Sequence, residues 1–179
     1  LVRAVRPTAG IDNGRWVVLD VESSGLDPTS DRLLAIAAIA VRTDGAQARI
    51  ALGDSFEVVL RQDVSVADKP NILLHGIGVG AQRRGVDPRV ALADFTRFVG
   101  ESPLIAFHAA FDRALILRAC AGARAPRPLN PWLDLEPLAA VLHPHVKVHS
   151  LDEWMAHLQI TCAVRHQAAA DTLATAELL

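Results

Sequence analysis

The chain has 179 residues, of which 51% are hydrophobic and 21% charged, and its formal net charge at pH 7 is −2. This size suits a single domain, residues 1–179, that buries about 70% of the surface of its unfolded chain. The slight acidity argues against a protein that holds long nucleic acid by bulk electrostatics, since such domains carry a clear basic excess. We expect residues 1–14 to form a flexible or peripheral N-terminal segment.

The composition also excludes several other classes. The longest purely apolar run, residues 33–41, is well short of the ~18 residues that a membrane helix needs. No charged-then-apolar secretory leader opens the sequence, so we expect a cytoplasmic protein without a membrane partner. Cys120 and Cys162 have no metal-ligand spacing, and we expect both to serve in packing.

The first half of the chain predicts three strands, because apolar and β-branched residues alternate with turn residues there. These strands are residues 16–21, 33–42 and 54–61. The first two are joined by a Gly-Leu-Asp-Pro turn, and the next two by a turn at residues 43–45. Such short connections favour antiparallel pairing.

The second half predicts helices and short strands. Asp87 is typical of an N-cap and Pro88 of a first helical position, which predicts a helix to about Val99 with Gly100 as its end. The expected elements after it are a strand at 104–107, a helix at 109–121 ended by Gly122, a strand at 131–133, a helix at 135–142 ended by Pro144, a helix opened by the capping box Ser150 and Glu153, and a last helix from about Gln167. Strands followed by β–α units predict a mixed sheet flanked by helices.

Five polar residues stand out against this background. Asp20 and Glu22 close the first strand, and the two-residue period of a strand puts both carboxylates on one face. Asp112 lies in the segment FHAAFD, and His166 and Asp171 lie in RHQAAAD. Carboxylates at the buried end of a strand are costly unless paired or metal-bound. Four carboxylates and an imidazole can hold two divalent metals against a phosphodiester and take a proton from water.

The order of these motifs resembles the DEDDh-type 3′→5′ exonucleases, a DnaQ-like family that includes the proofreading epsilon subunit of bacterial DNA polymerase III. The matching motifs are D-x-E at residues 20–22, H-x-x-F-D at 108–112 and H-x-A-x-x-D at 166–171. Segments 23–27, 32–34, 72–77 and 150–152 also match, so the resemblance covers residues 16–179 in order. It implies an α/β, ribonuclease H-like fold whose mixed five-stranded sheet has three antiparallel strands and then two parallel ones.

The resemblance also implies a role for each motif residue. Asp20, Glu22 and Asp171 would bind a first metal, Asp20 would be shared with a second, and Asp112 would act mainly through water. His166 would be the general base, since an imidazole ordinarily titrates near pH 6.5. Oxygen ligands suit two Mg²⁺ or Mn²⁺ ions per site, and the lack of a cysteine or clustered histidine set disfavours zinc.

Seven further residues are implied contacts of the terminal nucleotide: Ser23, Ser24, Gly25, Leu26, His75, His108 and Phe111. The alternatives are structural. The first four also make a turn that the chain needs here, and His75 also suits a helix end. A histidine group at 143, 145 and 149 invites a zinc interpretation, but a solvated loop explains it better.

Two positions depart from the family pattern. Relatives commonly read A-H-N-x-x-F-D, whereas Phe107 and His108 replace the His-Asn pair here. Ala35 stands where the family often has Glu in its second strand. Neither change removes a metal ligand or the base, and the first predicts an altered substrate preference.

The sequence thus predicts a metal-dependent exonuclease that releases nucleoside 5′-monophosphates from a single-stranded or frayed 3′ end of DNA. The alternatives are an exoribonuclease acting on short RNA ends and a noncatalytic module that docks on a polymerase or another protein. No residue distinguishes a contact to a 2′-hydroxyl. Retention of all five motif residues favours an enzyme over a module.

Overall fold

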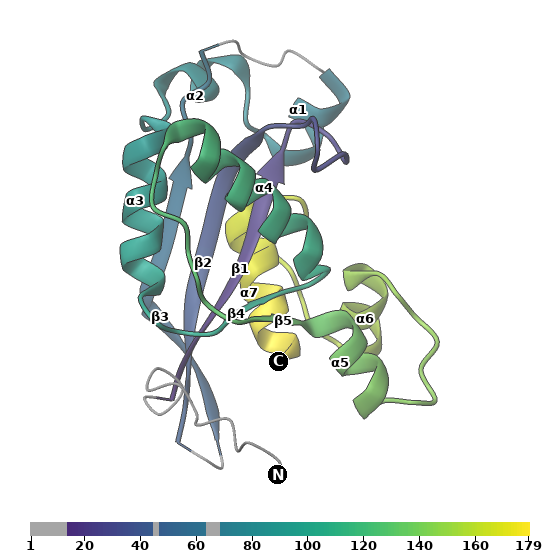
Figure 1. Cartoon of the computed structure of the whole chain (residues 1–179). Helices are drawn as coiled ribbons and strands as arrows, with labels where there is room; N and C mark the ends of the chain where they lie inside the picture. Colours follow the sequence, from purple (N-terminus) through teal and green to yellow (C-terminus); the bar gives the residue numbers. More distant parts are fainter. Residues whose placement is uncertain (1–13, 45–46, 64–68) are drawn as a thin grey trace.

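The computed structural model describes residues 14–44, 47–63 and 69–179 (Figure 1). The prediction for residues 1–14 therefore lies, except for Gly14, outside the described residues, as does part of the turn predicted at 43–45. Five strands form one sheet in the order β3-β2-β1-β4-β5. Their bounds are Arg15–Ser23 (β1), Leu33–Thr43 (β2), Ala48–Val59 (β3), Leu104–Ala106 (β4) and Trp132–Asp134 (β5). The pairs β1–β2 and β2–β3 are antiparallel, and β1–β4 and β4–β5 are parallel. The predicted fold class is confirmed.

Seven helices flank the sheet among the described residues: Lys69–His75 (α1), Val79–Arg84 (α2), Pro88–Val99 (α3), Ala109–Ala123 (α4), Leu135–Leu142 (α5), Leu151–Leu158 (α6) and Ala168–Leu178 (α7). Asp87 caps α3 and the capping box of Ser150 with Glu153 opens α6, both as predicted. The sequence did not predict α1 and α2. Helix α4 runs past Gly122 to Ala123, and Arg124 ends it in the left-handed region.

Strand β3 begins at Ala48, well before the predicted residue 54. The prediction missed this first part because a bulge interrupts the alternating pattern of the strand. Ile39 pairs with Ser55, whereas the next residue, Ala40, pairs with Ala51. The three residues left over, 52–54, form the bulge. A bulge shifts the alternation of inward and outward side chains, which hides the first part of the strand from a period-two search.

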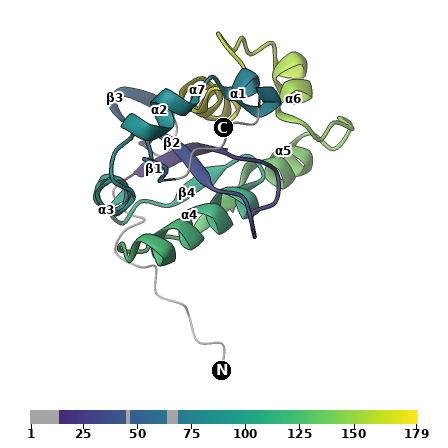
Figure 2. The same ribbon diagram turned by 90° about the horizontal axis from the view of Figure 1, so that it is seen from above.

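The side-chain alternation of β1 sets the two faces of the sheet. Val17, Leu19 and Val21 pack in one cluster with residues of α3 and α4, such as Phe95. Val18 points the other way, into the cluster that contains Ala176 of α7. Figure 2 shows α4 and α7 on opposite sides of the sheet. Asp20 and Glu22 share the parity of Val18 and therefore lie on the α7 face.

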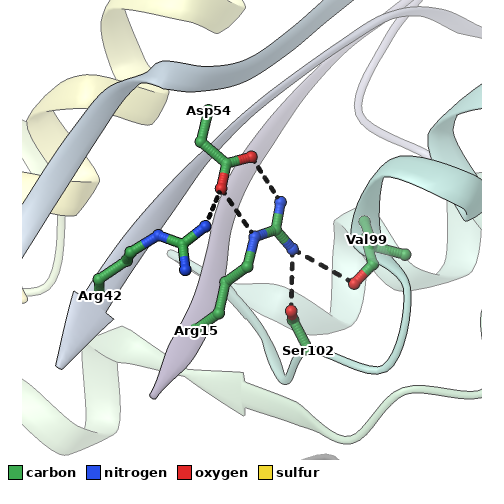
Figure 3. Close-up of polar contacts among 5 residues, drawn as sticks. All are labelled: Arg15, Arg42, Asp54, Val99 and Ser102. Carbon is green, nitrogen blue, oxygen red and sulfur yellow. Dashed lines mark hydrogen bonds and ion pairs between the residues drawn. The ribbon is translucent and has the colours of Figure 1, made fainter. Parts of the chain in front are cut away.

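A polar clamp ties the bulge to the start of β1 (Figure 3). The Arg15 guanidinium donates to both carboxylate oxygens of Asp54, at 2.9 and 2.8 Å, and Arg42 donates to the same carboxylate at 2.8 Å. Arg15 also donates to Ser102 Oγ at 2.9 Å and to the carbonyl of Val99 at 3.5 Å. The hydrogen bond from Arg15 holds the pKa of Asp54 below its ordinary value. The clamp thus joins β1, β2, β3 and the end of α3.

Loss of this clamp should cost stability. The Arg15 side chain is only 13% exposed, so Asp54→Ala leaves a largely buried cation without its carboxylate and should lower the free energy of unfolding by about 2 kcal/mol. Urea denaturation measures the change. Asp94→Ala, which breaks the exposed Asp94–Arg97 pair, is the control and should cost less than about 0.5 kcal/mol. Equal losses in the two variants would contradict a structural role for the clamp.

Over the ranges that the structure describes, no helix combines the length and apolarity needed to cross a lipid bilayer.

Candidate active site

Three of the predicted metal ligands meet on the α7 face of the sheet. Asp20 and Glu22 come from the second half of β1, and Asp171 comes from the first turn of α7. One carboxylate oxygen from each lies within 4.8 Å of the other two. Thr172 Oγ1 donates to the carbonyl of Ala37 at 3.3 Å, which fixes the start of α7 against β2. Residues far apart in the sequence therefore make one carboxylate group.

Asp112 adds a fourth carboxylate from the first turn of α4, where its side chain is buried. Burial raises the pKa of Asp112, although hydrogen bonds from the backbone N–H groups of Asp112 and Val21 oppose the shift. The pKa of Asp20 is raised well above its ordinary value, first by burial and then by the charges of Asp112, Glu22 and Asp171. These charges repel one another at short range, so the site favours protons or cations.

Glu22 supplies the test of whether a metal fits. Burial and then the charge of Asp171 raise its pKa to about 8, with Arg165 acting in the opposite direction. Its Oε1 atom is buried and has no hydrogen-bond partner among the described residues. A buried carboxylate oxygen without a donor is costly unless it binds a proton or a cation. An all-oxygen donor set of this kind fits a hard divalent cation such as Mg²⁺ or Mn²⁺.

Arg165 is a site residue that the sequence analysis missed. Its guanidinium makes ion pairs with Asp171 and with Asp152, which lies in the first turn of α6. These two carboxylates raise the already high pKa of Arg165. The residue thus joins α6 to α7 beside the metal ligands. Its position directly before His166 is the only sequence signal that could have found it.

His166 lies in the segment that leads into α7. Its backbone has φ of +60°, and its N–H donates to Asp171 Oδ2 at 3.0 Å. The side chain is half-buried. The structure therefore places the predicted base next to a predicted metal ligand, on a connecting segment outside the helix.

The end of β1 and the loop after it hold four of the predicted substrate contacts. Ser23 Oγ donates to the carbonyl of Gly25 at 2.5 Å, and Ser24 Oγ donates to Asp31 Oδ1 at 2.8 Å, so both hydroxyls support the loop itself. A Cβ on Gly25 would lie 2.5 Å from Asp31 Oδ2, so any larger residue here would displace the Asp31 side chain. Leu26 is 91% exposed beside the site. It is the member of this group whose side chain is available to a nucleotide.

The other three predicted contacts differ in exposure. His75 is buried at the end of α1, where its Nδ1 accepts a hydrogen bond from the N–H of Ile77 at 2.9 Å. Burial lowers its pKa. His108 is exposed at the N-cap of α4, and Phe111 is half-buried against the α3–α4 core. His75 therefore fits the structural alternative of a helix-end residue. Of the three, His108 has the side chain most accessible to a substrate.

The departures from the family pattern have local reasons. His108 has φ of +61°, a left-handed conformation that Asn, the common family residue, adopts more readily than most side chains. Phe107 packs against clusters that include residues of α5, α6 and α7, so it fills the interior. Ala35 pairs with Glu22 across β1 and β2 and is buried. A Glu at this position would bring one more carboxylate opposite Glu22.

The histidines near α5 do not form a metal group. Asp20, Glu22 and Asp171 make up the group of potential metal ligands found among the described residues. His143 instead stacks edge-on with Trp154 and His157, and His149 pairs with Glu136 at 3.1 Å.

A ribonuclease H-like sheet with a carboxylate group at the end of its first strand is typical of metal-dependent nucleases. The chain matches the exonuclease family model (RNase_T) over residues 17–179, and it belongs to this family. The DEDDh-type assignment made from the motifs is thereby confirmed.

Known relatives show where such domains occur. The chain is 31% identical to PolC-type DNA polymerase III of Clostridium perfringens over 166 residues, which are 92% of this chain and 11% of that protein. Identity to the Bacillus subtilis protein is 28% over 170 residues, 94% of this chain and 11% of that one. The chain thus spans about 11% of the length of these relatives.

Solved structures share the fold. A structure of exonuclease I superposes with a TM-score of 0.79 at 17% identity, covering 92% of this chain and 40% of that one. E. coli exonuclease I in complex with a dT13 oligonucleotide gives a TM-score of 0.77 at 18% identity, with coverage of 92% and 40%.

The raised pKa of Glu22 predicts a pH-dependent stability in chelator. An acid whose pKa rises on folding contributes stability that is fully present below its ordinary pKa, which is 4.5 for Glu22. This contribution is lost as the pH rises through the pKa of the folded state, about 8. The melting temperature of the chelated protein should therefore fall between pH 5.5 and 8.5. Glu22→Gln should reduce the fall, because the neutral amide does not ionise. Thermal melts across this range measure the effect.

Glu57→Gln, on the exposed side of β3, is the matched control and should leave the pH dependence as in the wild type. An identical fall in Glu22→Gln and the wild type would show that Glu22 does not titrate in this window.

Proposed function

We propose that the chain is a metal-dependent 3′→5′ exonuclease domain that hydrolyses the terminal phosphodiester of DNA and releases nucleoside 5′-monophosphates. The observation that carries the proposal is the meeting of Asp20, Glu22 and Asp171, with oxygens within 4.8 Å of one another, in a member of the exonuclease family. The charge of Asp112 also raises the pKa of Asp20, and Asp112 would complete the set. The domain would comprise the whole chain, with residues 1–14 peripheral.

The carboxylates would hold two Mg²⁺ or Mn²⁺ ions. Asp20, Glu22 and Asp171 would bind one ion, Asp20 would be shared with the second, and Asp112 would contribute mainly through water. The partnerless Oε1 of Glu22 supports direct ligation by that residue. When bound, the ions would lower the pKa of the attacking water and stabilise charge on the leaving 3′ oxygen. Bound ions would also offset the repulsion that Asp112, Glu22 and Asp171 exert on the charge of Asp20.

His166 would take the proton from the attacking water. Its backbone bond to Asp171 keeps it within reach of the metal ligands, and its place outside α7 leaves the segment free of helical hydrogen bonds. The carboxylate of Asp152 beside it would stabilise the imidazolium that forms.

DNA is the proposed substrate because the relatives are DNA polymerases and a fold relative was solved with a dT13 oligonucleotide. The exposed Leu26 and His108 would contact the terminal nucleotides, Leu26 with its apolar side chain and His108 with its ring. A polymerase is the proposed protein partner, since the matched relatives carry this domain within a polymerase chain.

The assignment predicts cleavage from one end that requires metal. With Mg²⁺ or Mn²⁺, a 5′-labelled DNA strand should shorten one nucleotide at a time from its 3′ end, and chelator should stop the reaction. A circular single strand should stay intact, because the site is built around an end. Gel analysis of DNA and RNA strands in parallel tests polarity and substrate together. Cutting of circles, or full activity in excess chelator, would refute the proposal.

Two variants distinguish the proposed general base, His166, from a proposed metal ligand, Asp20. His166→Ala should lower kcat by about 10²-fold or more, the range for general base catalysis, while Mn²⁺ affinity stays near that of the wild type. Asp20→Ala should instead lose Mn²⁺ binding itself. Single-turnover rates and Mn²⁺ calorimetry on both variants distinguish the roles. Loss of metal binding in His166→Ala as severe as in Asp20→Ala would rule out a pure base role.

A further inference from the structure

A second concave surface lies on the other side of the sheet, between the start of α3 and the second half of α4. This groove has a volume of about 510 Å³. Its apolar lining includes Leu33, Leu60 and Leu115. The carboxylate group described above contributes no residue to it. Figure 1 shows α4 crossing in front of the sheet beside α3, the two helices that border the groove.

The lining of the groove is basic, in contrast to the chain as a whole with its net charge of −2. Four separate segments each contribute one arginine: Arg32, Arg61, Arg89 and Arg118. Two aspartates oppose them, Asp63 and Asp87. Both carboxylate oxygens of Asp87 already have partners. One accepts a hydrogen bond from the backbone N–H of Arg89 at 3.0 Å, and the other pairs with the Arg61 guanidinium at 2.6 Å. The groove therefore keeps an excess of positive charge.

Two elements lead from the carboxylate group into this groove. On α4, Leu115 and Arg118 lie three and six residues after Asp112, which places Arg118 about 9 Å further along the helix axis at 1.5 Å per residue. On the sheet, Leu33 pairs with Ser23, the residue after Glu22. The Arg118 guanidinium also donates to the carbonyl of Thr29 at 3.0 Å, in the loop that carries Leu26. Helix α4 and the loop after β1 thus connect the carboxylate group, on the α7 face, to the groove on the opposite face.

We propose that this groove binds the sugar–phosphate backbone of the single strand on the 5′ side of the nucleotides held at the carboxylate site. The inference rests on the proposed function, since it assumes a nucleic-acid 3′ end at that site. Arginines at the rim suit phosphate oxygens. Contacts of this kind do not read sequence.

The test compares binding of short and long strands in Ca²⁺, by anisotropy of 5′-fluorescein oligothymidylates with 3 and 12 nucleotides. Arg89→Ala should weaken 12-mer binding about eightfold at 50 mM salt and lower the slope of log K against log salt by about 0.7, the value of one lost phosphate contact on a single strand. The 3-mer should weaken less than twofold. Arg89 is exposed and has no side-chain ion pair among the described residues, so the fold should be retained.

Arg97→Ala is the matched control, because Arg97 is an exposed arginine at the opposite end of the same helix. It should change neither length dependence nor salt slope. The proposal is overturned if Arg89→Ala weakens the two lengths equally, or no more than Arg97→Ala does. It is also overturned if only a duplex with a 3′ overhang is affected, since the groove would then hold the complementary strand. Wild-type protein that binds the 12-mer in this way but never trims it would refute the proposed function and leave the groove as a strand-binding site.

Discussion

The mutual repulsion of four carboxylates at the meeting point of β1, α4 and α7 is the constraint on which the rest of the structure depends. Burial raises the pKa values of Asp20, Glu22 and Asp112, so each charge is costly to hold there. The surrounding scaffold must offset that cost. Strand β2, buried on both faces along residues 33–41, supplies the rigid partner of β1, and the clamp of Arg15 with Asp54 fixes the far end of the sheet.

The same alternation that builds the core also builds the site. Along β1, one set of side chains enters the α3–α4 cluster, and the other set passes from Val18 to Asp20 and Glu22 under α7. A shift of one residue in the register would exchange the two sets and bury the carboxylates in an apolar cluster. The long antiparallel pairing of β1 with β2 prevents that shift. Folding and the proposed catalysis therefore depend on the same register.

Local signals made much of this predictable from the sequence, and non-local contacts account for what was missed. The strand period placed Asp20 and Glu22 on one face, and the caps at Asp87 and Ser150 marked the starts of α3 and α6. Helices α1 and α2 are short and bordered by glycines, so they offered no long periodic segment. The β3 bulge hid the start of its strand. Arg165 and the four arginines of the groove acquire their meaning from partners that only the fold brings together.

Helix α4 orders the charges that a strand would meet. Its first turn carries Asp112 in the acidic site, and six residues later Arg118 lines the basic groove. Phosphates are repelled by the carboxylates until cations neutralise them, whereas the arginines attract phosphates with or without metal. A strand bound first in the groove would then bring its 3′ end to the carboxylate site. That site would bind the end only when cations neutralise the carboxylates. In a chain with a net charge of −2, this separation of signs along one helix would let an acidic protein bind the proposed polyanionic substrate.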